Sequence, residues 1–583
     1  MDRNRQLAHI FEKMADILEF LGDNPFRIRT YRRVAKILEN LPMDVEEAIK
    51  TGYIKRIKGI GSSTLEKFEE FIKTGKVSKY EELRKKVPEE LLELMDIPGI
   101  GPKTLKAAYE KLGIRTKEEF IKALKDGSLA KLPGFGAKKV EKILKGLELW
   151  QKAQERIPLV VAYPLAHSVL EFLKERIEGL YENISIAGSL RRMKETIGDF
   201  DILVSAPEEN WDKIHAQFVK FPDAEDVILH GHTKSSIILK EFHRQVDLRT
   251  VEPDSWGAAL QYFTGSKHHN IKLREIAKEK GLKINEYGVY DVKSGKKVAG
   301  KTEEEVYAVL GMQFIPPEMR ENTGEIELAL KHALPPIVEY GQLRGDLHMH
   351  SNWSDGSNTI EEMVKACIDM GYEYMAIADH SQSARVANGL TPERFREQKK
   401  EIERLRKLYG DKITILWSVE VDILPDGSLD LPDDLLKEFD FVTASVHSRF
   451  NQDNTERIIK AMENPYVNLI GHPFGKQYGY REGYPLDFDR ILQKAKETNT
   501  ALEINSQRED LDSQHIRKAV EEGVKLVINS DAHSVKQLWT TVIGIGLARR
   551  GWAKAEDILN TQPLETLREF VRTKRELLGG ERQ

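Results

Sequence analysis

The stretch beyond residue 343 constrains the fold most strongly, because short apolar runs alternate there with segments of helical periodicity. The runs lie near residues 347, 374, 413, 441, 467, 501 and 525, and a helical segment follows most of them. Strands that alternate with helices at this spacing are typical of a parallel sheet, and their regular succession favours a closed barrel. In such a barrel the functional groups are expected at the carboxyl ends of the strands.

Histidines stand directly behind these apolar runs. Of the 16 histidines in the chain, seven follow residue 340, and six of those end a run: His348, His350, His380, His447, His472 and His533. Three carboxylates complete the set: Asp355, Glu420 and Asp531. One histidine at a strand end is more often a core residue than a ligand, but six buried imidazoles would each need a partner. Imidazole together with carboxylate favours Zn, Mn or Fe over Mg or Ca, so the pattern predicts a metal centre.

A second group of carboxylates lies earlier in the chain. Asp199 and Asp201 are two positions apart in a strand-like run, so they project to the same face, and Asp247 lies in another such run. Two-metal phosphoryl transfer requires such a trio. An isolated Asp-x-Asp would more simply be a solvated strand edge, but Gly188 and Ser189 upstream could cradle a phosphate, which favours the catalytic interpretation.

The first 150 residues read as helices separated by glycine-rich turns. Three turns share a Gly-x-Gly pattern, built from Gly59, Gly61, Gly99, Gly101, Gly134 and Gly136. Backbone N–H groups at the start of a helix can bind a phosphate without reading the base. One such turn is usually only a helix cap. Three copies indicate binding to a DNA backbone, although packing is a serious alternative for the third.

Charge is unevenly distributed along the chain, although the net charge is only −5. Lys and Arg minus Asp and Glu give +7 over residues 1–150, −5 over 151–340 and −7 over 341–583. A basic N-terminal region followed by acidic regions suits a DNA-binding part joined to metal-binding catalytic domains. Cys367 is the only cysteine, which excludes an intramolecular disulfide. With no signal-peptide pattern and no membrane-length apolar run, we expect a cytoplasmic monomer that is nucleoid-associated when on DNA.

The Gly-Ser and Gly-Asp-x-Asp motifs together resemble the polymerase β-like nucleotidyltransferases. The run Tyr262-Phe263-Thr264-Gly265-Ser266, with Asn270 and Arg274 after it, looks like family X DNA polymerases specifically, and the similarity covers about residues 1–320. This resemblance implies that Asp199, Asp201 and Asp247 hold two Mg²⁺ or Mn²⁺ ions. It also implies that Gly188, Ser189, Arg192 and Arg156 meet the triphosphate of a dNTP.

The same resemblance assigns the nucleotide-selecting residues. Tyr262 and Phe263, next to Gly265, would exclude a ribose 2′-hydroxyl, Asn270 would touch the new base, and Arg274 the template strand. Three positions depart from the family pattern: Gln245, Lys267 and Ile271 stand where Arg, an acidic residue and Lys are common. These changes leave the chemistry intact and bear on template stacking and fidelity.

The segment from Arg27 to Arg32, which contains Tyr31, resembles the small domain of the family that holds the 5′-phosphate of a gap. Lys67 falls where family members keep a lysine that forms a Schiff base with an abasic sugar. A lysine with a lowered pKa could do this work, whereas an exposed helical lysine is usually only solvated.

The histidine and carboxylate pattern of residues 343 to about 575 is that of the PHP domains, a (β/α)7-type barrel family of phosphoesterases. The resemblance implies that all nine metal positions are filled and that the barrel holds up to three ions of Mn, Zn or Fe. A vestigial barrel that merely supports the rest of the chain would be expected to lack some of these ligands, and none is missing.

We therefore expect a multidomain chain with an all-α helix–hairpin–helix region, an α+β palm and thumb, and a distorted (β/α)7 barrel. The expected divisions are 1–85, 86–150, 151–250, 251–315, a linker at 316–342, and 343–575. The expected function is short-gap filling of gapped or nicked DNA in repair by a DNA-directed polymerase. The barrel is expected to hydrolyse DNA phosphoesters as a 3′-5′ exonuclease, an abasic-site endonuclease or a 3′-phosphatase. The alternatives are a template-independent nucleotidyltransferase joined to a small-molecule phosphatase, and a DNA-binding scaffold without catalysis.

Overall fold

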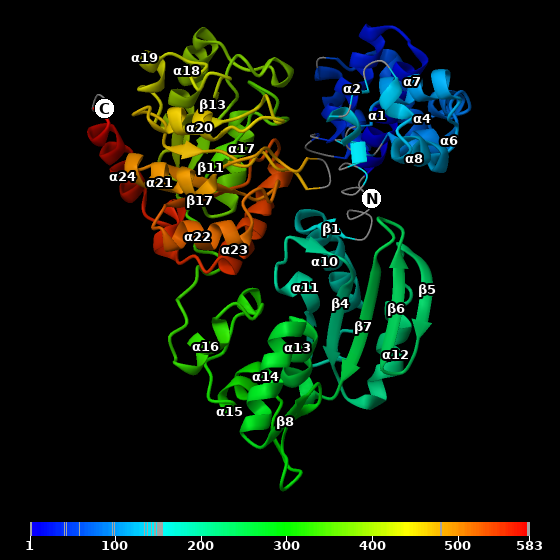
Figure 1. Ribbon diagram of the computed structural model, residues 1–583, viewed down its shortest axis with the longest axis vertical. Coiled ribbons are helices and arrows are strands. Elements are labelled where there is room, and N and C mark those ends of the chain that lie inside the picture. Colours follow the sequence, from blue (N-terminus) through cyan, green and yellow to red (C-terminus); the bar gives the residue numbers. More distant parts are fainter. Residues whose placement is uncertain are drawn as a thin grey trace.

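The computed structural model describes residues 3–579 except 40, 42–43, 58, 96, 98–99, 133–134, 137, 142, 145–146, 148–155 and 479–480. Figure 1 shows a helical N-terminal unit, a mixed unit built around a twisted sheet, and a barrel beside them. The multidomain architecture expected from the sequence is confirmed. Within the described residues, no helix has the length and apolar character to span a membrane.

The N-terminal unit consists of short helices around one apolar core. Its α-helices are α1 (Arg3–Leu21), α2 (Pro25–Glu39), α3 (Val45–Lys50), α4 (Ser62–Thr74), α5 (Ser78–Arg84), α6 (Glu89–Leu94), α7 (Pro102–Leu112) and α8 (Lys117–Lys125). A single cluster of buried apolar side chains runs from Leu7 to Leu147. The ring centroids of Phe20 and Tyr109 lie 5.7 Å apart, so the two helical units expected on either side of residue 85 share this core.

The palm is a five-stranded sheet in the order β2-β4-β7-β6-β5. Its strands are β2 (Asn183–Ile186), β4 (Phe200–Ser205), β5 (Ala224–His230), β6 (Lys234–Leu239) and β7 (Gln245–Val251). β4 and β7 run parallel, and the other neighbours are antiparallel. Helices α10 (Leu159–Arg176), α11 (Gly188–Arg191) and α12 (Trp211–Phe218) accompany the sheet.

The thumb combines four helices with a three-stranded sheet. The helices are α13 (Trp256–Thr264), α14 (Lys267–Glu279), α15 (Glu303–Val309) and α16 (Glu325–Leu330), and the strands are β8 (Leu282–Asn285), β9 (Gly288–Asp291) and β10 (Lys297–Ala299). Part of the segment expected as a linker, residues 316–342, is folded into this unit. Met319 and Ile326 belong to the thumb core, and the fully buried Arg320 pairs with Glu303 at 2.6 Å. The Pro pairs mark turns around packed structure, because the apolar side chains between them find partners in the thumb.

The barrel contains seven parallel strands in chain order. They are β11 (Gly345–Met349), β12 (Tyr374–Ile377), β13 (Thr414–Asp422), β14 (Phe441–Ser445), β15 (Leu469–Ile470), β16 (Ala501–Asn505) and β17 (Leu526–Asn529). The backbone N–H of His350 donates to the carbonyl of Ala532 at 2.8 Å, so the last strand returns to the first and the barrel is nearly closed. The seven apolar runs of the sequence are these seven strands.

Helices cover the outside of the barrel and the amino ends of its strands. They are α17 (Ile360–Asp369), α18 (Pro392–Tyr409), α19 (Asp433–Leu436), α20 (Thr455–Met462), α21 (Phe488–Thr498), α22 (Ser513–Glu521), α23 (Thr541–Arg550) and α24 (Leu564–Leu577). Leu567, Phe570 and Val571 of α24 join the first residues of several strands in one apolar cluster. This helix therefore closes the amino ends of the strands, which leaves the carboxyl ends for chemistry.

Candidate functional site

All nine of the histidines and carboxylates predicted to bind metal gather at the carboxyl ends of the barrel strands. His348 and Glu420 lie within β11 and β13, and the others follow the ends of β11, β12, β14, β15 and β17. Most of these side chains are buried, although His447 and His533 keep partial exposure. Strand ends fix the positions of the ligands, because each strand is held by its neighbours on both sides.

Glu420 is the centre of this cluster. The residue is 1% exposed. Its carboxylate oxygens lie close to ring nitrogens of five histidines: His380 at 3.0 Å, His472 at 3.0 Å, His447 at 3.3 Å, His348 at 3.4 Å and His350 at 3.6 Å. A carboxylate in this position can bridge ions that different histidines hold.

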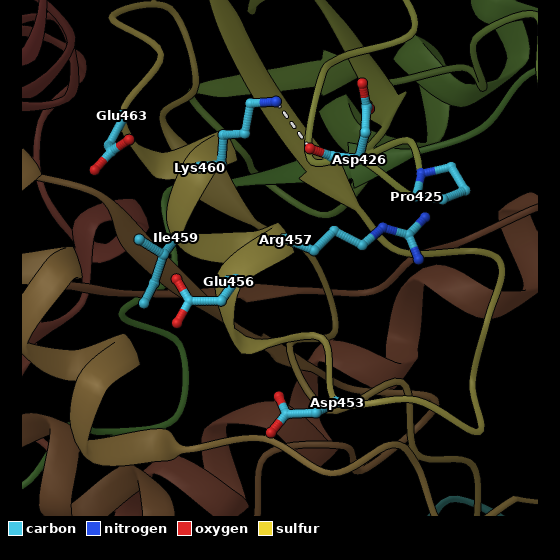
Figure 2. A pocket seen from close by; sticks show the side chains of 8 residues that line it. All are labelled: Pro425, Asp426, Asp453, Glu456, Arg457, Ile459, Lys460 and Glu463. Carbon is cyan, nitrogen blue, oxygen red and sulfur yellow. Dashed lines mark hydrogen bonds between the residues drawn. The ribbon is translucent and has the colours of Figure 1, made fainter.

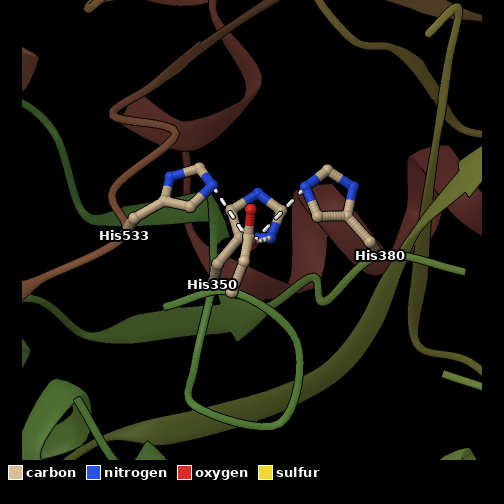
Figure 3. Close-up of side chains that lie close together, drawn as sticks. His350, His380 and His533 are labelled. Atoms are coloured by element: carbon tan, nitrogen blue, oxygen red, sulfur yellow. Dashed lines mark ion pairs between the residues drawn. The ribbon is translucent and has the colours of Figure 1, made fainter. Parts of the chain in front are cut away.

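A second carboxylate, Asp355, joins three further ring nitrogens. Its Oδ1 lies 3.3 Å from His533 Nε2, 3.6 Å from His380 Nε2 and 4.0 Å from His350 Nδ1. Figure 3 shows the rings of His350, His380 and His533 turned toward one another across this point.

Three sets of ligand atoms lie close enough together to hold one ion each. They are His350, Asp355, His380 and His533; His348, His350 and Glu420; and His380, Glu420 and His447. The sets share His350, His380 and Glu420, so the geometry suits a cluster of bridged ions. His472 and Asp531 fall outside the three sets but adjoin them, since Asp531 Oδ1 lies 3.1 Å from His350 Nε2.

The chemistry of the cluster fits divalent metal ions. Five ring nitrogens are buried without a well-oriented hydrogen bond among the described residues, although three of them lie within 3.4 Å of Glu420: His348 Nε2, His350 Nδ1, His380 Nδ1, His447 Nε2 and His472 Nδ1. Unpaired buried polar atoms are costly, and metal coordination satisfies them. These unpaired nitrogens adjoin ionised carboxylates, which is the donor set that Zn, Mn or Fe prefer.

Charge in the cluster is compensated locally. Burial opposes protonation of His447, yet the neighbouring carboxylates Glu420 and Asp422 raise its pKa to about 10. Burial likewise opposes protonation of His533, and Asp355 raises its pKa to about 9. Burial and the nearby imidazoles lower the pKa of His350 to about 3. A bound cation would replace the protons on these rings, because a ligating imidazole must be neutral.

Further carboxylates orient the ligands from behind, and the sequence did not single them out. Glu503 Oε1 lies 2.6 Å from Nδ1 of His348, which leaves Nε2 of that ring facing Glu420. Asp422 contacts His447 Nδ1 in the same way. Both acids lie in strands that are buried along almost their whole length, β16 and β13. An acidic residue inside a buried strand is the signal that could have identified them.

Two cationic side chains, one from the barrel and one from the N-terminal unit, also contact this cluster. Arg508 Nε lies 3.1 Å from Asp531 Oδ2. From the N-terminal unit, Lys36 Nζ lies 3.0 Å from Asp355 Oδ2, and the hydroxyl of Tyr53 donates to the carbonyl of Ser357 at 3.2 Å. Helix α2, which carries Lys36, therefore faces the mouth of the barrel.

A surface pocket of about 420 Å³ on the barrel is a different feature from the metal centre. Figure 2 shows its lining: Pro425, Asp426, Asp453, Glu456, Arg457, Ile459, Lys460 and Glu463. Four of these residues are acidic and two are basic, and Lys460 is tied to the carbonyl of Asp426 at 2.8 Å. A lining with this excess of negative charge is unsuited to a phosphate group.

Substitution of Glu420 tests the metal centre directly. Glu420→Gln keeps the side-chain volume but removes the charge that the histidines surround, so we expect the purified protein to lose at least one equivalent of bound transition metal. Inductively coupled plasma mass spectrometry measures the metal content. Asp426→Asn, which removes a carboxylate from the surface pocket, should leave the metal content unchanged. Equal metal content in the Glu420→Gln variant and the unmodified protein would contradict this assignment.

The palm brings two of its three predicted carboxylates side by side. Asp201 in β4 and Asp247 in β7 are direct partners in the parallel register of the two strands. Burial, with the charge of Asp247, raises the pKa of Asp201 to about 6. Asp199 is exposed just before β4. Two acids that repel each other in a half-buried site are stabilised by a cation between them.

Asp247 is held by three neighbours. Ser236 Oγ and Gln245 Nε2 donate to its Oδ1 at 2.6 and 2.8 Å, and Lys234 Nζ lies 2.7 Å from Oδ2. Burial raises the pKa of Asp247, but these contacts outweigh it and lower the pKa. Gln245, one of the three positions that depart from the pattern noted in the sequence, thus orients this carboxylate with its side-chain amide.

Gly188 lies against the same site. Its φ is +65°, and a Cβ at this position would be 2.4 Å from Oδ2 of Asp201. Only glycine lets the start of α11 approach the carboxylate this closely. The backbone of Gly188 and Ser189 therefore lies at the entrance of the carboxylate site, where a phosphate cradle was expected.

Comparison with known proteins bears on both sites. Family models match for a helix-hairpin-helix domain (residues 2–77), a SAM-like helix-hairpin-helix tandem (91–148), the DNA polymerase beta thumb (259–321) and the PHP domain (346–507). The DNA polymerase/3′-5′ exonuclease PolX of Bacillus subtilis is 41% identical over 97% of this chain and 99% of its own length. The chain belongs to the family X DNA polymerases that carry a PHP domain.

Two other relatives each match one part of this family X polymerase. A "Probable phosphatase" of Thermoanaerobacter is 30% identical over 41% of this chain and 98% of its own length. DNA polymerase lambda of Arabidopsis thaliana is 28% identical over 55% of this chain and 62% of its own length. The family implies dependence on divalent metal ions, and both carboxylate sites suit such ions.

The arginines expected at the triphosphate are held by the palm and thumb of the polymerase. Arg156 Nε donates to Thr196 Oγ1 at 2.8 Å. Arg192 is nearly buried; its Nε pairs with Glu321 at 2.9 Å, and its Nη1 donates to the carbonyl of Thr264 at 2.6 Å.

The residues expected to select the nucleotide cluster around the end of α13. Tyr262 and Phe263 make an edge contact at 5.1 Å between ring centroids. Asn270 donates to the carbonyl of Tyr262 at 2.8 Å, and Gly265 packs on the guanidinium of Arg192. Arg274 is exposed on α14. The structure thus brings Tyr262, Phe263, Gly265 and Asn270 together.

The glycine turns of the N-terminal unit are partly described. Gly61 and Gly101 immediately precede α4 and α7, and Gly136 caps a further helical turn by accepting from Lys139 at 2.8 Å. Gly59 has a φ of +110° and lies against Arg33. Gly99 and Gly134 lie outside the described residues. Open helix starts at Gly61 and Gly101 leave backbone N–H groups free of side-chain caps, as phosphate binding requires.

Tyr31 and Lys67 both lie on helices of the N-terminal unit of the polymerase. Tyr31 packs against Phe11 with ring centroids 5.6 Å apart, and Phe11 packs against Phe68. Lys67 Nζ donates to the carbonyl and hydroxyl of Ser63 at 2.8 and 2.9 Å. Partial burial lowers the pKa of Lys67, which favours the neutral amine that a Schiff base needs.

Gly188→Ala tests the close approach in the palm. The new methyl group would collide with Asp201, so we expect primer extension to fall at least about tenfold, while DNA binding stays within a factor of two. Gly179→Ala is the matched control, because Gly179 has a φ of +77° with nothing within 4 Å of the added Cβ. Equal loss of extension in both variants would mean that backbone strain, and not the carboxylate, is responsible.

Proposed function

We propose that this polymerase fills short gaps in DNA at the palm carboxylates and hydrolyses phosphoesters at DNA 3′ ends in the barrel. The observation that carries the proposal is that one chain holds both Asp201 opposite Asp247 in the palm and three adjoining groups of histidines and carboxylates in the barrel, each able to hold one ion. The similarity to the Bacillus subtilis polymerase/exonuclease along nearly the whole chain supports the pairing of the two activities.

At the palm we propose that Asp199, Asp201 and Asp247 hold two Mg²⁺ or Mn²⁺ ions. Such ions lower the pKa of a primer 3′-hydroxyl and neutralise charge on the triphosphate. Ser189, Arg156 and Arg192 then orient the triphosphate of the dNTP. Tyr262 and Phe263 exclude a ribose 2′-hydroxyl, Asn270 contacts the base, and Arg274 contacts the template.

At the barrel we propose up to three ions of Mn, Zn or Fe, held by the nine ligands. The nitrogen-rich donor set supports these ions over Mg²⁺. Glu503 and Asp422 orient two of the imidazoles, and Arg508 places a fixed positive charge beside Asp531, where a phosphate could be held. Gapped or nicked DNA is the proposed substrate of both sites, and Tyr31 and the glycine turns are proposed to bind it. The protein is proposed to be a cytoplasmic monomer that associates with the nucleoid when it is bound to DNA.

A second activity of the barrel is supported by one comparison. A stretch equal to 41% of this chain aligns with 98% of a "Probable phosphatase". Removal of a 3′-phosphate or incision at an abasic site is therefore the alternative to removal of nucleotides. Three labelled duplexes that end in a 3′-hydroxyl mismatch, a 3′-phosphate or an internal abasic site distinguish these activities with the same protein preparation.

A crossed pair of variants tests whether the two sites act independently. Asp201→Ala removes a carboxylate from the palm, so gap filling should fall by roughly 1,000-fold while 3′-end hydrolysis persists. His350→Ala opens two of the three ligand sets in the barrel, so hydrolysis should vanish while gap filling persists. Both activities are measured on a 5′-labelled gapped duplex with Mn²⁺, with and without dNTP. Loss of both activities together in either variant would show that the two-site assignment is wrong.

Lys67 is proposed as the nucleophile of a 5′-deoxyribose-phosphate lyase. Borohydride should trap a covalent adduct with a 5′-deoxyribose-phosphate substrate, and Lys67→Ala should abolish trapping while extension on an undamaged gap is retained. Lys73→Ala is the control, because Lys73 is exposed on the same helix. Undiminished trapping in Lys67→Ala would assign the adduct to another amine.

A further inference from the structure

The barrel makes a close contact with the nucleotide-binding side of the palm. Helix α23 of the barrel packs against the turn that follows α11, and a Cβ at Gly546 would lie 2.4 Å from Cε of Met193. Met193 itself is buried with a φ of +51°. The backbone next to Arg192 therefore packs directly against the barrel.

Arg550, at the end of α23, connects three groups of the palm and thumb. Its Nη1 donates to the carbonyl of Arg192 at 2.9 Å and to Oε1 of Glu321 at 3.0 Å. Its Nη2 lies 3.6 Å from Glu195 Oε2. The side chain is 6% exposed, so water screens these contacts little.

Glu321 is shared between two guanidinium groups. The same Oε1 that accepts from Arg550 also accepts from Nε of Arg192 at 2.9 Å. Burial raises the pKa of Glu321, but the two arginines outweigh it and lower the pKa, so the carboxylate is ionised. Arg550 therefore acts on Arg192 in two ways. It donates directly to the backbone carbonyl of Arg192, and it binds the Glu321 carboxylate that holds the Arg192 guanidinium.

The guanidinium of Arg192 has a second fixed point on the thumb. Its Nη1 donates to the carbonyl of Thr264 at 2.6 Å, directly beside the Gly265 turn. An arginine held at both its backbone and its side chain loses little further freedom when it binds a phosphate, and this preorganisation improves affinity.

We propose that Arg550 is a positioning residue for nucleotide binding, through which the barrel holds Arg192 in place for the triphosphate of the dNTP. The inference rests on the proposed role of Arg192. In this arrangement the barrel also stabilises the polymerase site, because α23 holds the turn that carries Arg192. Loss of Arg550 frees the turn after α11 and leaves Glu321 with one cationic partner.

Arg550→Met in the full chain is the direct test. Methionine keeps the apolar stem and removes the donors, so we expect the KM for dNTP in gap filling to rise about tenfold, with kcat changed by less than about threefold. Hydrolysis of 3′ ends, measured on the same preparation, should stay within a factor of two. Should that hydrolysis also be lost because the fold is disturbed, Arg550→Lys serves instead, with an expected rise in KM of at least twofold.

Arg549→Met is the matched control for docking of the barrel. Arg549 is the neighbouring, equally buried residue of α23, but it pairs with Glu318 and donates to the carbonyl of Val338, and no contact joins it to Arg192. We expect its KM for dNTP to be near that of the unmodified protein. An equal rise in both variants would mean that docking in general is responsible and would overturn the proposal, as would an unchanged KM in Arg550→Met or, if it is used, Arg550→Lys.

A double-mutant cycle with Arg192→Ala separates this proposal from the function on which it rests. If Arg192→Ala leaves the KM for dNTP unchanged, the role of Arg192 is wrong and the inference falls with it. If Arg192→Ala raises KM and Arg550→Met does not, only the inference is overturned. The expected result is that both raise KM and that Arg550→Met has no added effect in the Arg192→Ala background.

Discussion

Glu420 is the interaction on which the barrel centre depends. Its buried carboxylate touches five imidazoles, and those imidazoles come from β11, β12, β14 and β15 or the turns behind them. An ionised carboxylate in a dry interior is stable only when it is well paired, so the cluster forms only if the whole set of strands is in register. Closure of the barrel and assembly of the histidine and carboxylate cluster are thus one event. The outer helices, and α24 at the amino ends of the strands, stabilise the closed barrel.

The two metal sites follow different electrostatic rules. In the palm, oxygen ligands repel one another, and the pKa of Asp201 rises to about 6. In the barrel, imidazoles surround the acids, and the pKa of Glu420 lies well below its usual range because the histidines outweigh its burial. The two groups of acids therefore present different electrostatic surroundings to a divalent ion.

Much of the fold could be predicted from the sequence because local signals agree with the tertiary structure. The seven barrel strands are short apolar runs, and most of the nine predicted ligands lie at or just after the end of one, so position in the chain gives position in space. The palm carboxylates were recognisable for the same reason. Glu503 was missed, because an acid inside a buried strand signals a buried partner but does not say which residue that partner is. The segment 316–342 was expected as a linker, since Pro pairs mark turns whether or not the residues between them are packed. Arg550 and Glu321 are 229 positions apart, and no periodicity reports such a contact.

Lys36 has a consequence for how the parts of the molecule influence one another. The lysine belongs to the helical unit, and its partner Asp355 belongs to one of the three ligand sets of the barrel. Whatever binds that carboxylate competes with the lysine, and by reciprocity whatever draws the lysine away favours a cation at the carboxylate. Lys36 is about half exposed, with a side-chain exposure of 45%, and a pair of this kind is worth about 0.2–1 kcal/mol. Release of this ion pair would therefore change the affinity of Asp355 for a cation by a factor of about one and a half to five, so the placement of a helix in the N-terminal unit would adjust cation binding in the barrel.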